Sequence, residues 1–231
     1  MRILVTAAEQ QEIDCALKAY DNVKESLPSD VQIDFTLTGI GITCACYTVT
    51  KGIYTGRLEG NPYNLIINIG IAGSYDLEQF PIGSAAIIDR EYFGDLGFDS
   101  EQGFEDLFKY GIWEKDQFPY TNGALARKVT PYKNIEEALS RYSSGAGLTV
   151  QTVTGKESKV KELANMFSPM IESMEGAAVY YAALMEDVPF FELRSVSNAV
   201  GERDTKKWDS KAALNTLHDC CSEIFSALIV K

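Results

Sequence analysis

Two short segments in the last third of the chain carry polar side chains where strands are expected to end. They are residues 171–178 (IESMEGAA) and residues 190–198 (FFELRSVSN). Ligands bind at the carboxyl ends of strands in an α/β sheet. Glu175 stands where the first strand turns into a helix, and the partly positive helix N-terminus favours an ionised carboxylate. Arg194 and Asn198 bring a cation and an amide to the same end, which predicts a small-molecule pocket. A structural pair between Glu175 and Arg194 is the alternative.

A loop after the first expected strand carries two more carboxylates. Residues 6–12 read TAAEQQE, and their small side chains let a ligand approach the backbone. Glu9 and Glu12 also open a helix, where acids commonly serve the helix dipole. A catalytic role and a role at the helix terminus are therefore both open for Glu12.

Two glycine-containing loops follow further expected strands. Residues 38–43 (TGIGIT) resemble a dinucleotide fingerprint only superficially, because Cys44 replaces its third glycine and the segment follows the second strand. An anion site at a helix N-terminus and a plain tight turn remain possible there. Residues 68–74 (NIGIAGS) contain paired glycines that permit close approach of a ligand to the backbone.

The elements that position these residues alternate along most of the chain. Strands are expected at residues 2–6, 31–38, 64–69, 84–89, 147–153, 169–174 and 189–196. Helices are expected near residues 9–26, 43–58, 156–167, 175–187 and 206–229. This pattern predicts an α/β fold in which one domain, residues 1–231, forms three α/β/α layers around a central mixed, mostly parallel twisted sheet.

Residues 91–120 are an exception to the alternation, since aromatic side chains crowd among acids and glycines there. An exposed aromatic surface usually marks a binding surface. This segment can be a pocket lid, a subunit contact or an ordinary packed loop.

The charge and composition restrict the partners. The chain has 231 residues, 45% of them hydrophobic, and a formal net charge of -12. Such acidity argues against a nucleic-acid backbone or an anionic membrane as partner. Met1 leads directly into a strand-like segment without a basic and apolar leader, and no apolar run approaches the length of a membrane span. A cytoplasmic location is therefore expected.

The inventory of cysteine and histidine favours neither a metal site nor a cofactor. Five cysteines without Cys-x-x-Cys spacing are expected to be reduced thiols. His218 is the one histidine, so Ser-His or Cys-His catalysis would depend on it, and no nucleophile-elbow motif accompanies it. A structural or surface role is expected for His218.

Taken together and in order, five motifs resemble the nucleoside phosphorylase and nucleosidase superfamily. They are residues 7–12 (AAEQQE), 39–41 (GIG), 68–73 (NIGIAG), 174–178 (MEGAA) and 194–198 (RSVSN). The resemblance spans roughly residues 1 to 225. It implies a small-molecule purine nucleoside as partner and a homo-oligomer, for which a dimer is favoured.

The resemblance also implies roles for individual residues. It places the Met174 side chain against the ribose and the Glu175 carboxylate on a ribose hydroxyl. Glu12 matches the carboxylate that activates water in related nucleosidases. Asn198 matches the side chain that faces the O6 and N7 edge of the purine.

Further positions match the segments that hold the base. Thr152 and Val153 correspond to the segment whose backbone meets the base, and Ala72 and Gly73 to the glycine-rich wall. Arg194 is counted with these substrate-binding residues.

The chain also departs from the adenine-specific nucleosidases. Where those enzymes have Ser and Asp, this chain has Ile71 and Asn198, and where they carry a second acid before Met it has Ser173. These differences argue against methylthioadenosine or adenosylhomocysteine as substrate.

The inventory and the resemblance together predict an enzyme that hydrolyses the N-ribosidic bond of a 6-oxopurine nucleoside without a metal. Such a bond breaks through an oxocarbenium-like state, for which Glu175, Asn198 and Glu12 supply negative charge, help for the leaving base and a means to activate water. A nucleoside phosphorylase is the first alternative, although the first loop lacks a phosphate segment of the Gly-Asp-Pro-x-Arg kind and carries acids instead. A methylthioadenosine or adenosylhomocysteine nucleosidase and a non-catalytic nucleoside-binding protein are the others.

Overall fold

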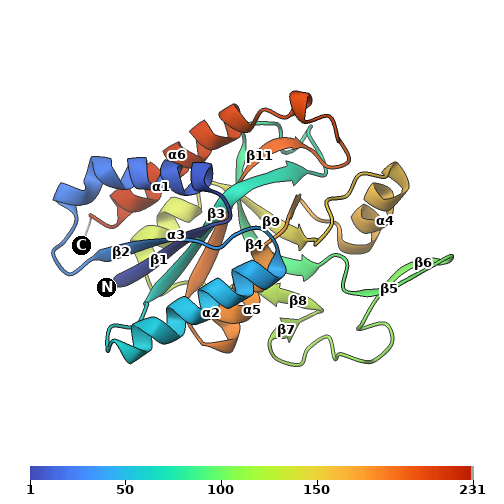
Figure 1. The fold of residues 1–231 in the computed structure, drawn as a ribbon, viewed down its shortest axis with the longest axis horizontal. Coiled ribbons are helices and arrows are strands. Elements are labelled where there is room, and N and C mark those ends of the chain that lie inside the picture. Colours follow the sequence, from blue (N-terminus) through green and yellow to red (C-terminus); the bar gives the residue numbers. More distant parts are fainter. Residues whose placement is uncertain (230–231) are drawn as a thin grey trace.

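The computed structural model describes residues 1–229, and its first part alternates strands and helices (Figure 1). Strand β1 (Arg2–Ala7) lies between β2 (Gln32–Leu37) and β3 (Leu65–Ser74), and both pairings are parallel. Helices α1 (Gln10–Val23) and α2 (Ile42–Leu58) connect these strands. Parallel strands connected through helices direct their carboxyl ends toward one edge of the sheet.

The later strands close a ring with β3. Strand β11 (Phe190–Ala199) pairs in parallel with β3 and antiparallel with β4 (Ala85–Phe93). Strand β4 pairs in parallel with β9 (Ser143–Thr149), and β9 with β10 (Ile171–Ser173). Strand β10 returns antiparallel to the end of β3. The register of β11 shifts between Val196 and Asn198, a bulge that redirects side chains at the end of the strand.

Helices lie on both faces of the sheet (Figure 1). Helices α1, α3 (Lys133–Leu139) and α6 (Ser210–Ala227) contribute to the cluster on one face. Helices α2 and α5 (Gly176–Met185) contribute to the cluster on the other. Helix α4 (Glu157–Phe167) supplies Leu163 to a smaller cluster with Leu148 and Val150.

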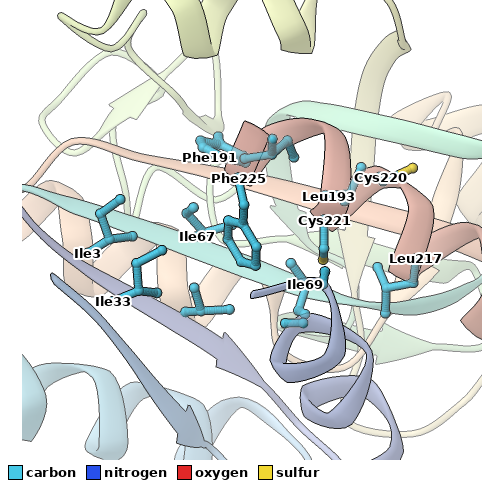
Figure 2. Packing of buried hydrophobic residues seen from close by; sticks show 14 of the residues in the cluster. Ile3, Ile33, Ile67, Ile69, Phe191, Leu193, Leu217, Cys220, Cys221 and Phe225 are labelled. Carbon is cyan, nitrogen blue, oxygen red and sulfur yellow. The ribbon is translucent and has the colours of Figure 1, made fainter. Parts of the chain in front are cut away.

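Figure 2 shows the core on the α1 and α6 face. Isoleucines of β1, β2 and β3 meet Phe191 and Leu193 of β11 and Leu217, Cys221 and Phe225 of α6. Complete burial of each such large apolar side chain stabilises the fold by roughly 1.5–3 kcal/mol. The sheet that carries the pocket residues is therefore anchored from behind by a continuous apolar layer.

Each strand and helix expected from the sequence has a counterpart in the structure, and the sheet is mixed as predicted. The bounds of several strands differ from those expected: β3 and β4 run on to Ser74 and Phe93, past the expected ends at 69 and 89, and β9 and β10 differ from the expected residues 147–153 and 169–174. Strand β9 begins earlier, at Ser143. It contains Gly145 and Gly147, which lie where the side chains of Met170 and Glu91 pack against the strand. A Cβ atom at Gly145 would lie 2.8 Å from the Met170 methyl group. Glycines required by packing therefore disguised the start of the strand.

The region between β4 and α3 contains elements that the alternation did not predict. A hairpin of β5 (Gly97–Ser100) and β6 (Gly103–Asp106) projects from the body, and β7 (Tyr120–Thr121) and β8 (Ala124–Ala126) extend the sheet from β4 (Figure 1). Short 3-10 helices occupy Lys24–Ser26 and Thr205–Lys207.

Two groups of contacting aromatic side chains lie within residues 91–120. Phe108, Trp113 and Tyr120 pack on one another against the body. Phe98 and Tyr110 contact each other and remain exposed. Ordinary loop packing thus accounts for the first group, and a lid or a subunit contact stays a prediction for the second. Among the helices of residues 1–229, none is long and apolar enough to cross a membrane.

Candidate active site

A cavity of about 230 Å³ opens at the carboxyl ends of β1, β3, β10 and β11. It is lined by residues from the loop after β1, the end of β3, the loop after β9, the β10–α5 junction and the segment after β11. This is the sheet edge at which the sequence predicts a pocket. A wider groove, about 500 Å³, lies between α1 and α6 beside His218. The carboxyl-end cavity is the better site because several of its polar side chains are buried.

Glu12 is a buried acid that faces this cavity. Its Oε2 accepts hydrogen bonds from the backbone N–H groups of Ala8 (3.1 Å) and Glu9 (3.0 Å), and its Oε1 accepts one from Ile71 N–H (2.9 Å). Burial raises the pKa of the Glu12 carboxyl group, although the Arg194 charge and the backbone hydrogen bonds act against it. Glu12 therefore both caps the start of α1 and faces the cavity. A carboxylate with a raised pKa accepts a proton more readily, which suits a general base.

Glu175 lies where two helices begin. It occupies the N-cap position of α5, and its Oε1 accepts a hydrogen bond from Gly41 N–H (2.9 Å) at the N-cap of α2. Gly41 has φ +91°, a conformation that glycine adopts without strain. Partial positive charge at both helix termini favours the carboxylate there. The glycine-containing loop before α2 thus holds the Glu175 carboxylate at the helix N-terminus.

Arg194 lies fully buried beneath the cavity wall. Its Nε donates to Glu192 Oε1 (2.6 Å), and its Nη2 lies 3.9 Å from Glu175 Oε2. Burial would lower the pKa of the guanidinium, but the carboxylates of Glu192, Glu175 and Glu12 outweigh burial and leave the pKa raised. The pair that the sequence offered as an alternative to a pocket is therefore present, and it forms part of the pocket wall.

Gly70 makes room for this arrangement on β3. A Cβ atom there would collide with Arg194 Nη1 and would lie 2.9 Å from Glu12 Oε1. The Arg194 guanidinium can lie across β3, close to Glu12 and Glu175, only because position 70 has no side chain.

Two further glutamates lie deeper, within the strand ring. Glu91 and Glu192 are both fully buried. Among the described residues, Glu91 Oε1 and Glu192 Oε2 have no hydrogen-bond partner, while Glu91 Oε2 accepts from the Thr149 hydroxyl (2.8 Å). Both unpaired oxygens lie against Gly176: a Cβ atom there would collide with the first and lie 2.8 Å from the second. Both carboxyl groups therefore lie next to Gly176.

These two acids differ in their charge partners. Glu192 is paired with Arg194, whereas Glu91 has only the Thr149 hydroxyl. Burial and the Glu192 carboxylate raise the pKa of Glu91 well above its ordinary value. Glu91 consequently keeps its proton at pH values where an exposed glutamate is ionised.

The Asn198 amide is oriented by its neighbours. The Ser197 hydroxyl donates to Asn198 Oδ1 (2.7 Å), and Asn198 Nδ2 donates to Ala199 O (2.8 Å). Asn198 is only 7% exposed, and it lines the cavity. One Nδ2 hydrogen and one Oδ1 lone pair remain for a ligand.

The structure brings most of the predicted residues to the cavity. Its lining includes the side chains expected to act in catalysis or to hold the ribose and base, namely Glu12, Ala72, Gly73, Val153, Met174, Glu175 and Asn198. Arg194 is buried behind the lining. Thr152 is exposed and does not line the cavity, because β9 ends at Thr149 and the chain turns outward.

Sequence reasoning missed several residues of the site. Glu172 lines the cavity beside the predicted Met174 and Glu175, and Trp208 lies on its far wall. Alternation along the strand identifies Glu172 and Met174 as neighbours on one face, a signal already present in the motif. Neither Glu91 nor Glu192 gave such a signal, since Glu192 lies within the expected strand 189–196 and Glu91 lies beyond the expected strand 84–89, in the aromatic segment 91–120. The structure places His218 on α6 within hydrogen-bond distance of Asp219 (3.0 Å), at the groove and away from the cavity.

The comparison with protein families supports the same class. The phosphorylase superfamily matches residues 36–229. The futalosine hydrolase of Streptomyces coelicolor is 30% identical over 196 residues, which covers 84% of this chain and 79% of that protein.

Solved structures share the fold. A futalosine hydrolase of Helicobacter pylori aligns with a TM-score of 0.75 at 16% identity, covering 100% of this chain and 97% of the other. A 5′-methylthioadenosine/S-adenosylhomocysteine nucleosidase of Colwellia psychrerythraea, solved with adenine, aligns with a TM-score of 0.74 at 19% identity, covering 99% and 96%.

The chain thus belongs to the phosphorylase superfamily and, within it, to the futalosine hydrolase family. The motifs at residues 153–155 (VTG) and 197–204 (SNAVGERD), together with GIAG and MEGAA, are those that resemble futalosine hydrolases in particular.

The buried Glu91 predicts an unusual dependence of stability on pH. Above about pH 4.5 the unfolded chain releases a proton that the native state keeps, so the native state binds more protons and the free energy of unfolding falls as pH rises. Glu91→Gln removes this proton while keeping an acceptor for Thr149. We expect the fall to become shallower by up to about 1.4 kcal/mol per pH unit.

Urea unfolding between pH 5 and pH 8 measures this slope. The exposed Glu137→Gln variant is the matched control and should keep the wild-type slope. An unchanged slope in Glu91→Gln would show that Glu91 is ionised in the folded protein.

Proposed function

We propose that this protein hydrolyses futalosine, a 6-oxopurine nucleoside, to hypoxanthine and dehypoxanthine futalosine, a step in menaquinone biosynthesis. One observation carries the proposal. Among residues 1–229, every ionisable side chain that lines the cavity is a glutamate, at positions 9, 12, 172, 175 and 202. Such a cavity stabilises a positively charged ribosyl transition state and opposes phosphate as the nucleophile. Kinship with futalosine hydrolases supports the same reaction.

Each step of the reaction has a residue suited to it. Glu175, aligned by Gly41 and close to Arg194, accepts a hydrogen bond from a ribose hydroxyl and places negative charge near the sugar. The bond between C1′ and the purine nitrogen breaks, and its electron pair moves into the base. Glu12 takes a proton from water as the water oxygen forms a bond to C1′. Hypoxanthine leaves after N7 takes up a proton from solvent, Asn198 Oδ1 accepts a hydrogen bond from N7–H, and Glu12 afterwards releases its proton to solvent.

The orientation of Asn198 supports a 6-oxopurine. With its oxygen toward Ser197 and its nitrogen toward Ala199, the amide donates to a carbonyl at O6 and accepts from N7–H. The adenine amino group would face the amide nitrogen instead. A site whose hydrogen-bond pattern is mismatched can discriminate by up to about 10⁴-fold.

The 5′ substituent of futalosine carries a carboxylate, and Arg57, Arg203 and Lys206 are three cations of the chain that such a group could meet. Arg57 pairs with Glu186 near the end of α2, whose opposite end adjoins Glu175. At 1.5 Å per residue these ends are about 24 Å apart, which removes Arg57. Arg203 packs on Gly155, close to the cavity residue Val153. Arg203 is therefore better placed than Arg57 to bind the carboxylate.

The rest of the proposal concerns the whole chain. Residues 1–231 act as one three-layer α/β/α catalytic domain in the cytoplasm, in a homo-oligomer for which a dimer is favoured. The helices on both faces of the sheet support the layers. The net charge of -12 supports the absence of nucleic-acid and membrane partners.

Purine release from futalosine, measured with and without phosphate, tests the proposed reaction. Hydrolysis releases hypoxanthine at the same rate in both, with a free sugar hydroxyl as co-product. Phosphate-dependent release would make the protein a phosphorylase. Binding of futalosine without release would make it a nucleoside-binding protein, and preferential release of adenine from methylthioadenosine would favour the other nucleosidase class.

Glu12→Gln tests the base. The amide cannot take a proton from water, so turnover should fall by at least about a hundredfold while substrate binding changes little. Turnover and binding are measured on futalosine by steady-state kinetics and calorimetry. Glu137→Gln alters an exposed acid away from the cavity and serves as the control, with turnover expected to stay at the wild-type value. Nearly normal turnover in Glu12→Gln would leave Glu12 with its helix-terminal role alone.

Asn198→Asp tests recognition of the base. A protonated aspartic acid can accept from the adenine amino group and donate to N7, so the preference for hypoxanthine over adenine should fall by at least about tenfold. The comparison uses ribosides with the same 5′ group in wild type and variant. Equal efficiency with both bases in wild type, or no shift in the variant, would contradict the assignment.

A further inference from the structure

We infer that Glu172 is a second specificity residue, whose carboxylate accepts a hydrogen bond from N1–H of the 6-oxopurine. The inference rests on the proposed function and deepens it. It starts from a buried acid of the cavity that the mechanism leaves without a task. Glu172 is 6% exposed and lines the same cavity as Asn198.

Strand register places Glu172 and Asn198 on opposite sides of one glycine. Gly73 of β3 pairs with Glu172 of β10 on one side and with Asn198 of β11 on the other. Neighbouring strands are about 4.8 Å apart, so the two residues lie about 10 Å apart across Gly73. A Cβ atom at Gly73 would lie 3.0 Å from Val200 Cγ2 and 3.3 Å from Asn198 Nδ2. The glycine therefore lets Val200 and Asn198 pack closely over β3, and it separates the amide from the carboxylate by about the width that a planar base spans.

The Glu172 carboxylate is held in place from the side away from the base. Its Oε1 accepts from Thr154 N–H (2.9 Å) and its Oε2 from the Tyr75 hydroxyl (2.9 Å). Burial and the adjacent Glu172 raise the pKa of Tyr75, which keeps the phenol a donor. Each carboxylate oxygen retains a free lone pair. In the part of the chain that the structure describes, no cation forms an ion pair with Glu172.

These free lone pairs match a donor and repel an acceptor. Hypoxanthine carries a hydrogen on N1, whereas N1 of adenine carries a lone pair. A carboxylate beside N1 therefore binds the first base and opposes the second. Asn198 discriminates at O6 and N7, and Glu172 discriminates at N1. Because the two contacts lie on different strands, each can be removed without the other.

The test compares two ribosides with the same 5′ group, one of hypoxanthine and one of adenine, in wild type and Glu172→Gln. Glutamine keeps the shape and can turn its NH₂ toward N1 of adenine. We expect the ratio of kcat/KM for hypoxanthine over adenine to fall by at least about thirtyfold. Tyr75→Phe is the matched control, because it removes one hydrogen bond to Glu172 and leaves the carboxylate present. It should change both substrates alike and leave the ratio within about threefold.

A substrate change gives the same test in the unaltered protein. The 1-deaza analogue of the hypoxanthine riboside has C–H in place of N1–H, and its kcat/KM in wild type should be at least about tenfold lower. Equal losses on both bases in Glu172→Gln, or full activity on the 1-deaza analogue, would overturn the inference. If wild type hydrolysed none of these ribosides, the proposed function would fail, and calorimetry would still test the inference: Glu172→Gln should bind hypoxanthine at least about tenfold more weakly, and equal binding would overturn it.

Discussion

The candidate site depends on one fully buried guanidinium, that of Arg194, and on the acids gathered around it. A buried charge is stable only when it is paired and hydrogen-bonded. Arg194 is paired and hydrogen-bonded through Glu192 at 2.6 Å, while Glu175 at 3.9 Å and Glu12 share its field. Arg194 Nη2 has no hydrogen-bond partner among the described residues. The cation therefore fixes the positions of the acids that face the cavity. Gly70 is part of the same constraint, because a side chain there would displace the guanidinium.

The balance of charge around Arg194 favours a cationic guest. One guanidinium cannot neutralise all the acids near it, and protonation of Glu91 removes only part of the excess. The remaining negative charge lies where Glu12 and Glu175 reach the cavity. An oxocarbenium-like ribosyl group is the species that this field stabilises, and water is the nucleophile that it tolerates. The Asn198 amide is neutral and is held by Ser197 and Ala199. It therefore selects the base by its pattern of hydrogen-bond donors and acceptors and not by charge.

Much of this could be predicted from the sequence because polar residues at strand ends contrast with apolar strands. Glu175, Asn198 and Glu12 were found in that way, and the mixed sheet followed from the alternation of elements. Glu91 and Glu192 could not be found, because their environment is set by pairing between strands distant in sequence. The early start of β9 was hidden because Gly145 and Gly147 serve packing. Thr152 was placed by the family resemblance alone, and only the turn after β9 shows that it lies outside the cavity.

The central claim is that the acids organised by Arg194 stabilise positive charge at the ribose. Its most direct test is the ratio of dissociation constants for two hypoxanthine ligands of the same shape. One carries a protonated pyrrolidine ring in place of the ribose ring, and the other carries an uncharged cyclopentane ring. Interaction with a partly buried carboxylate about 4 Å away is worth a few kcal/mol, so the cationic ligand should bind at least about a hundredfold more tightly. Equal binding of the two ligands would contradict the account.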